Sequence, residues 1–76
     1  VKIADALHNV STIIADWQRE GTKVWDRFNR GPEQTAAYYQ RIAEVGRQRL
    51  GAHPLVVEYE ATAGRLRELA QAVVSD

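Results

Sequence analysis

The sequence predicts an all-α fold with three long helices and one short helix. Apolar residues recur at spacings of three and four positions along most of the 76 residues, and no stretch alternates polar and apolar side chains as a strand would. Glycine and proline residues interrupt this pattern at three places. The expected helices are therefore about residues 1–20, 22–30, 32–50 and 55–74.

The first expected helix has one apolar stripe with members four and three residues apart. The stripe consists of Ile3, Leu7, Val10, Ile14 and Trp17. Gly21 is expected to end this helix, because glycine readily adopts the left-handed conformation common at helix C-termini.

The short second helix has an apolar edge formed by Val24, Trp25 and Phe28. Together with Trp17, its aromatic residues could form either a ligand platform or part of the core. Core packing is the expected role, because it would attach this short segment to the first helix.

The third and fourth helices each show a stripe that should face inward. Pro32 suits the first turn of the third helix, where a missing N–H costs nothing. The stripe of the third helix is Ala36, Tyr39, Ala43, Gly46 and Leu50, with Ile42 alongside. The stripe of the fourth is Leu55, Tyr59, Thr62, Leu66, Leu69 and Val73. Its heptad-like spacing fits packing within the chain or association with another copy.

Composition excludes several classes of function. Ten basic residues balance ten acidic ones, so no overall field attracts nucleic acid or an anionic membrane. The arginines are numerous, but acidic residues interleave with them and no nucleic-acid-binding motif is present. No apolar run reaches the roughly 20 residues of a membrane span. The absence of cysteine excludes disulfides and thiolate metal sites. We expect a cytoplasmic protein that binds neither nucleic acid nor membrane.

The chain is expected to be a single partial domain, residues 1–76. In chains of roughly 70–80 residues or fewer, one apolar core seldom supplies more than about 3–5 kcal/mol. The start at Val1, without methionine, suggests a piece of a longer protein. Because surface left uncovered by missing helices would be apolar, we expect self-association into a homo-oligomer.

A polar stripe runs along the first helix, away from its apolar stripe. Its members are Lys2, Asp5, Asn9, Thr12 and Asp16. This is the pattern of a solvated helix face. It also fits part of an active site, because carboxylates bind divalent cations, and amides and hydroxyls bind sugars and bases. His8 follows Asp5 by three residues, within reach of joint coordination, although isolated His8 and His53 also fit hydrogen-bonded or solvated imidazoles.

The opening stretch VKIADALHN resembles the Lys-x-Ala-Asp-x-Leu-His-Asn signature near the end of HD-domain metal-dependent phosphohydrolases, and is most similar to the guanosine tetraphosphate hydrolase-like group. The likeness continues through GTKVWDRFNRGPEQTAAYY and covers about the first forty residues. The resemblance implies the C-terminal portion of an HD-domain helical fold. It also implies hydrolysis of a nucleotide or pyrophosphate-type substrate such as guanosine tetraphosphate.

Site roles follow from the resemblance position by position. Asp5 matches the last aspartate of the family's metal-binding set. Asn9 matches the asparagine that contacts the nucleotide, and Thr12 lies one turn further on, where a hydroxyl would be near the nucleotide. Lys2 would support the phosphate, and His8 would pack beside the site. The implied cofactor is a divalent metal: Mn²⁺ first, with Mg²⁺, Fe²⁺ or Zn²⁺ as alternatives.

The sequence also departs from the family pattern. Ala6 and Ser11 stand where basic residues are frequent, which leaves guanosine tetraphosphate in doubt as the substrate. The family's first histidine and His-Asp pair lie upstream of the matched region. We therefore expect no catalytic residue within these 76 residues and no activity from the isolated chain. The alternative hypothesis is a non-catalytic helical interaction or oligomerisation module.

Overall fold

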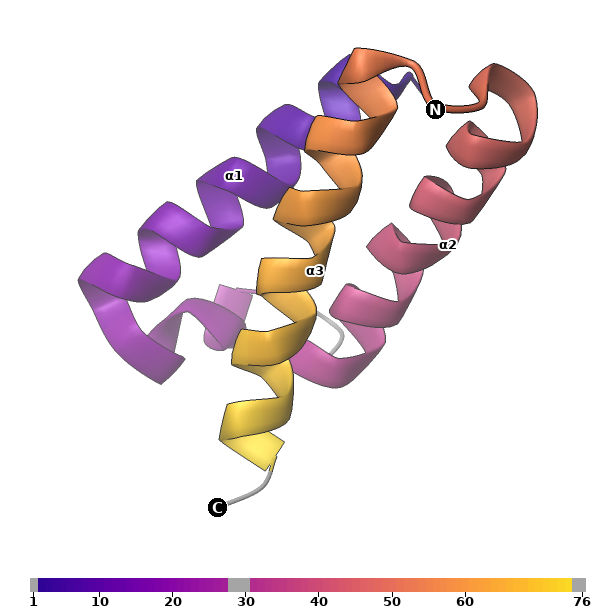
Figure 1. Cartoon of the computed structure of the whole chain (residues 1–76). Helices are drawn as coiled ribbons and strands as arrows, with labels where there is room; N and C mark the ends of the chain where they lie inside the picture. The colour runs from indigo at the N-terminus through magenta and orange to yellow at the C-terminus, as the bar shows by residue number, and fades with distance from the viewer. Residues whose placement is uncertain (1, 28–30, 75–76) are drawn as a thin grey trace.

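The computed structural model describes residues 2–27 and 31–74. It contains α1 (Ile3–Glu20), a 3₁₀-helix η1 (Gly21–Arg27), α2 (Pro32–Leu50) and α3 (Pro54–Val74), and no strand within the described ranges (Figure 1). The all-α prediction is confirmed.

Glycine and proline set the ends of the helices as predicted. Gly21 and Gly51 have φ angles of 68° and 63°, a region that favours glycine. Their backbone N–H groups donate to the carbonyls of Trp17 and Arg47, so each glycine caps the helix before it. Pro32 is the first residue of α2.

The segment predicted as an α-helix over residues 22–30 is instead the 3₁₀-helix η1, which begins at Gly21 and ends at Arg27. The segment has only seven residues, and 3₁₀ turns are frequent as connectors between α-helices. Val24 of η1 is fully buried, and Trp25 meets Trp17 edge to face, with ring centroids 5.0 Å apart and planes at 87°. The expected core role is confirmed for both tryptophans. Phe28 lies outside the described residues.

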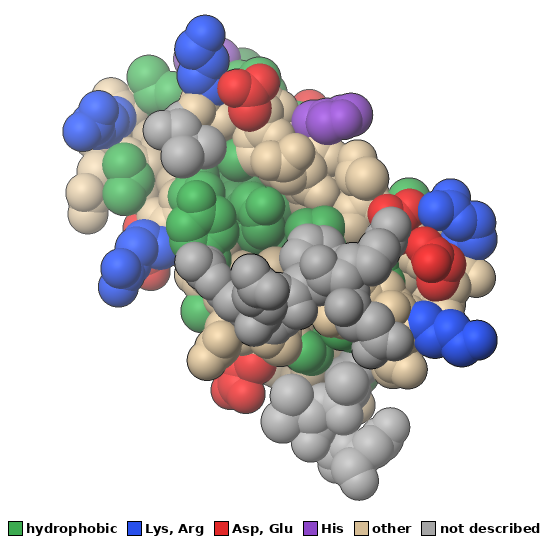
Figure 2. Space-filling view, turned by 180° about the vertical axis from the view of Figure 1, so that it is seen from behind, with side chains coloured by type: hydrophobic (Ala, Val, Ile, Leu, Met, Phe, Trp, Pro, Cys, Tyr) green, Lys and Arg blue, Asp and Glu red, His purple; other side chains and the backbone are tan. Residues whose placement is uncertain are grey.

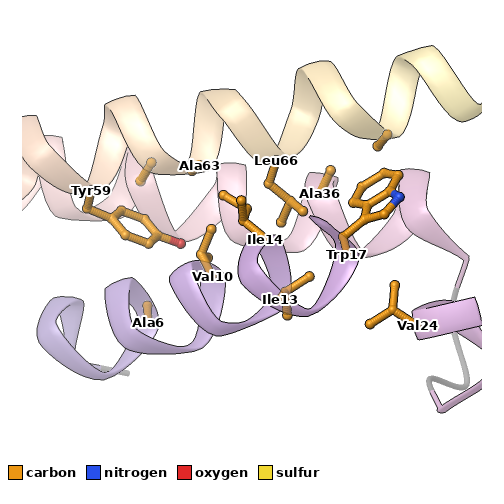
Figure 3. Close-up of a cluster of buried hydrophobic side chains, with 12 residues drawn as sticks. Ala6, Val10, Ile13, Ile14, Trp17, Val24, Ala36, Tyr59, Ala63 and Leu66 are labelled. Atoms are coloured by element: carbon orange, nitrogen blue, oxygen red, sulfur yellow. The ribbon is translucent and has the colours of Figure 1, made fainter. Parts of the chain in front are cut away.

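The core lies where α3 packs against both α1 and α2 (Figures 1 and 3). From α1, Ile14 points toward Leu66 of α3, and Val10 points toward the same helix beside Tyr59 (Figure 3). The largest fully buried side chain is that of Tyr59, whose hydroxyl donates to the backbone carbonyl of Tyr39 in α2 at 2.8 Å. A buried polar group thus has its partner, and α3 is tied to α2.

The inward faces of α2 and α3 differ in part from the predicted stripes. On α2, Ala36, Ala43 and Gly46 are buried, but Leu50 is 52% exposed at the end of the helix. The fully or nearly fully buried row on α3 consists of Val56, Tyr59, Ala63, Leu66 and Ala70. The predicted Leu55, Thr62 and Leu69 are only half-buried. Because α3 packs on both α1 and α2, its buried face is displaced by one position from the predicted stripe at several places.

Gly46 marks another close approach. A Cβ built on Gly46 would lie 2.8 Å from Cδ1 of Ile3, which is closer than real carbon atoms pack. The absence of a side chain therefore lets the first turn of α1 lie against α2.

Candidate functional site

The residues predicted to form the site lie on the first turns of α1. Lys2 is the N-cap residue and Asp5 lies in the first turn. The side chains of Lys2, Asp5, Asn9 and Thr12 are all exposed. Within residues 2–27 and 31–74, none of these four side chains forms a hydrogen bond or an ion pair. These four members of the predicted polar stripe are therefore exposed and available for contacts with a ligand or another protein.

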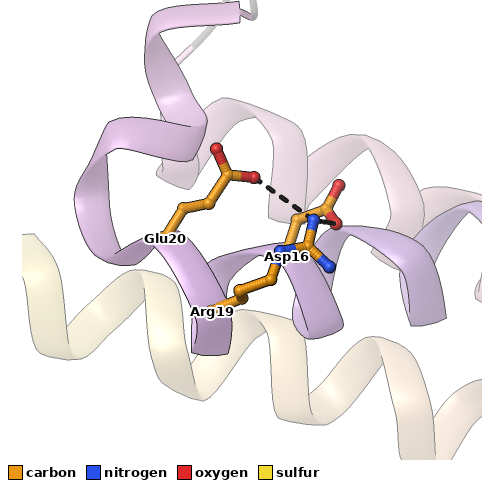
Figure 4. A network of polar contacts seen from close by, with 3 residues as sticks. All are labelled: Asp16, Arg19 and Glu20. Carbon is orange, nitrogen blue, oxygen red and sulfur yellow. Dashed lines mark hydrogen bonds and ion pairs between the residues drawn. The ribbon is translucent and has the colours of Figure 1, made fainter.

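Asp16, the last member of the stripe, is used differently. Its carboxylate accepts a hydrogen bond from the Arg19 guanidinium at 2.6 Å, and the same guanidinium lies 3.5 Å from the Glu20 carboxylate (Figure 4). These contacts form a surface ion-pair cluster at the C-terminal end of α1. The stripe therefore divides into an available N-terminal part and an internally paired C-terminal part.

The two histidines have different surroundings. His8 is exposed on α1, one turn from Asp5. His53 precedes α3, and its Nδ1 accepts a hydrogen bond from the backbone N–H of Leu55 at 3.1 Å. This bond satisfies one of the N–H groups left free at the helix start. His53 therefore acts as a helix cap, in line with the interpretation of a hydrogen-bonded imidazole.

The donor set present does not complete a metal site. In the part of the chain that the structure describes, no group of three or more His, Cys, Asp or Glu side chains lies close enough together to hold a cation. Asp5 offers one carboxylate, whereas catalytic metals usually take about three protein ligands or rely on substrate phosphates. The described residues by themselves therefore do not provide enough ligands to hold a catalytic metal.

A second feature, which the sequence analysis missed, is a groove of about 620 Å³ bounded by the start of α1, the C-terminal part of α2 and the start of α3. Its lining is mostly apolar. The lining residues are Lys2, Ile3, Ala4, Tyr38, Arg41, Ile42, Val45, Gly46, Arg49, Leu50 and Leu55. Figure 2 shows hydrophobic side chains gathered on the face turned away from α3. The helical spacing of Tyr38, Ile42 and Val45 could have indicated a second apolar face on this helix, but the sequence prediction gave the helix only one.

An ion pair fixes α2 against α3 at the surface. The Arg47 guanidinium donates to both carboxylate oxygens of Glu60, from Nε at 3.0 Å and from Nη2 at 2.5 Å. This hydrogen bonding lowers the pKa of Glu60 below its ordinary value and raises the pKa of Arg47. Both side chains remain partly open to solvent, so the contact orients the two helices more than it stabilises them.

No family model, curated protein or solved structure matches this chain. Among the described residues, no helix combines the length and the apolar character needed to cross a bilayer.

Proposed function

We propose that this chain is the C-terminal part of an HD-type, divalent-metal-dependent phosphohydrolase. The complete enzyme would act in the cytoplasm on a nucleotide or pyrophosphate-type substrate such as guanosine tetraphosphate. One observation carries the proposal: Lys2, Asp5, Asn9 and Thr12 stand exposed on one face of α1, with side chains that have no partner among the described residues. These are the residues of the HD-like signature and the hydroxyl one turn beyond it.

The roles follow the order of these residues along the helix. Asp5 provides one metal ligand, Asn9 and Thr12 bind the nucleotide, and Lys2 supports a phosphate group. His8 packs beside the site without binding the metal. From Lys2 to Thr12 the row extends about 15 Å at the α-helical rise per residue. That length suits separate contacts to the metal, phosphate and nucleoside parts of one extended substrate.

The proposal places the remaining ligands outside this sequence. A histidine and a His-Asp pair, contributed by other helices of the complete domain, would join Asp5 around the cation. Mn²⁺ is the proposed metal, with Mg²⁺, Fe²⁺ or Zn²⁺ as alternatives. The isolated chain would then bind Mn²⁺ weakly and release no phosphate from nucleotides.

The test compares two aspartates of α1 in the complete polypeptide that contains this segment. Release of phosphate and pyrophosphate from guanosine tetraphosphate and other nucleotides is measured with Mn²⁺ for Asp5→Ala and Asp16→Ala. Asp5→Ala should lower the rate by about a hundredfold or more, because loss of a ligand weakens metal binding. Asp16→Ala should leave the rate nearly unchanged, since Asp16 is paired with Arg19. Full activity of Asp5→Ala, or a complete gene without the histidine and His-Asp pair, would refute the proposal.

The alternative, a non-catalytic helical interaction or oligomerisation module, was suggested by the stripe on the fourth predicted helix. Two of its members, Tyr59 and Leu66, are fully buried within the chain, so this stripe is used for internal packing. An interaction module would need a different face. Self-association remains a prediction, and sedimentation velocity at micromolar concentration tests it: a folded monomer would contradict it.

A further inference from the structure

The helix α2 has a second patterned face beside its buried one. Tyr38, Arg41, Ile42, Val45 and Arg49 line the groove and follow one another at spacings of three, one, three and four residues. With Leu50 they extend over about 18 Å of helix at the α-helical rise per residue. The pattern is that of a helix contacting another helix, yet α3 packs on the opposite side, where Ala36 and Ala43 are buried.

This second face is apolar and open to solvent. Three of its large side chains are well exposed: Tyr38 at 42%, Val45 at 43% and Leu50 at 52%. Ile3, Ile42 and Leu55 are half-buried and complete the groove. A concave surface with contiguous exposed apolar side chains is typical of a site that binds another protein segment.

The charge at the edge of the groove has one sign. Lys2, Arg41 and Arg49 line it, and no acidic residue belongs to the lining. None of these three cations forms an ion pair with another described residue. In Figure 2, Lys and Arg side chains stand around the hydrophobic face, with Asp or Glu side chains among them. The chain as a whole carries no net charge, so this positive edge is a local property of the groove.

The positive edge distinguishes between two occupants. A second copy docked symmetrically through this groove would bring like charges together, which costs energy at an interface. A segment with carboxylates beside an apolar stripe would instead pair its charges with the three cations. The length of the α2 face matches a helix of about three to four turns.

We propose that this groove binds an acidic amphipathic helix of a partner protein. The partner's apolar residues, at positions i, i+3, i+4 and i+7, would cover Val45, Ile42 and Leu50. Its Asp or Glu side chains would lie beside Arg41, Arg49 and Lys2. Apart from Lys2, which belongs to both, this binding site and the exposed polar row on α1 consist of different residues, and the site does not depend on the phosphohydrolase proposal.

The test uses two synthetic helical peptides of 18 residues (about five turns) that share one leucine stripe. One peptide carries glutamates beside the stripe, and the other carries lysines at the same positions. Binding to the 76-residue chain is measured by isothermal titration calorimetry. The acidic peptide should bind with a 1:1 stoichiometry and lose affinity as salt rises. The basic peptide should bind at least about tenfold more weakly.

Matched variants locate the binding site. Val45→Glu places a carboxylate in the groove, whereas Val57→Glu adds the same charge at a valine of similar exposure, 48%, outside it. Val45→Glu should weaken binding of the acidic peptide by about tenfold or more, and Val57→Glu should have little effect. Arg49→Glu should weaken it similarly, unlike Arg65→Glu on α3, outside the groove. Circular dichroism establishes that each variant keeps its helical content.

Each other outcome would overturn the proposal. Binding that is absent at millimolar peptide, equal for the two peptides, or unaffected by Val45→Glu would show that the groove does not select an acidic helix. A homodimer in sedimentation velocity that Val45→Glu dissociates and Val57→Glu leaves intact would make a second copy the occupant.

Discussion

The contact between Gly46 and Ile3 yields a prediction about a single methyl group. Gly46→Ala adds a Cβ that would lie 2.8 Å from Cδ1 of Ile3, 3.5 Å from its Cγ1 and 3.7 Å from Cγ2 of Val56. Only the first of these distances is a steric conflict. Ile3→Val removes Cδ1, the one conflicting atom, so the two substitutions together exchange one methyl group for another at the same place.

The magnitudes follow from two opposing effects. Alanine stabilises a helix interior by about 1 kcal/mol relative to glycine. Displacing Cδ1 of the half-buried Ile3 forces that side chain off its preferred rotamer, at a cost of about 0.5–1.5 kcal/mol. Gly46→Ala alone should therefore change the free energy of unfolding by nearly zero. In the Ile3→Val background the same substitution should raise it by about 1 kcal/mol. The coupling in the double-mutant cycle should be about 1 kcal/mol.

Urea unfolding followed by far-ultraviolet circular dichroism measures the four free energies of the cycle. Gly64→Ala is the control, because Gly64 lies in α3 and a Cβ there meets no atom within 4 Å. It should raise the free energy of unfolding by about 1 kcal/mol whether residue 3 is isoleucine or valine. Equal effects of Gly46→Ala in both backgrounds would refute the packing of α1 on Gly46.

Four further predictions concern α3. Leu66→Ala removes a fully buried side chain and should lower the free energy of unfolding by about 2–5 kcal/mol, measured by urea unfolding. Burial raises the pKa of Tyr59 above its ordinary 10.0, so the stability that Tyr59 gives the folded state is complete below pH 10 and is lost as pH rises further. Thermal unfolding of Tyr59→Phe should therefore show a smaller loss of stability at alkaline pH than that of the unsubstituted chain. The hydrogen bond from Arg47 holds the pKa of Glu60 below its ordinary 4.5, so the stability that this pair gives the folded state is present above pH 4.5 and is lost as pH falls through the pKa of Glu60 in the folded chain. Thermal unfolding of Glu60→Gln should therefore show a smaller loss of stability at acid pH. His53→Ala should lower the free energy of unfolding by about 1 kcal/mol, and His53→Asp should retain it, because aspartate is a better N-cap.

The candidate site could be predicted only in part. The spacing of Lys2, Asp5, Asn9 and Thr12 predicted a shared helix face, because position on a helix follows directly from residue number. The same spacing did not distinguish Asp16, whose pairing depends on where the Arg19 side chain lies. The groove was missed because it needs parts of three helices at once, and its residues are far apart in the sequence.

Local sequence determined the helices and most of their ends. Glycine's access to positive φ fixed the stops at Gly21 and Gly51, and proline's missing N–H fixed the start at Pro32. These are properties of single residues and their immediate neighbours. Tertiary packing decided which edge of each apolar stripe became buried, because burial depends on where the neighbouring helices lie and not on the position of a residue along its own helix. On α3 the buried row includes Ala63 and Ala70, whereas Leu55 and Leu69 are only half-buried.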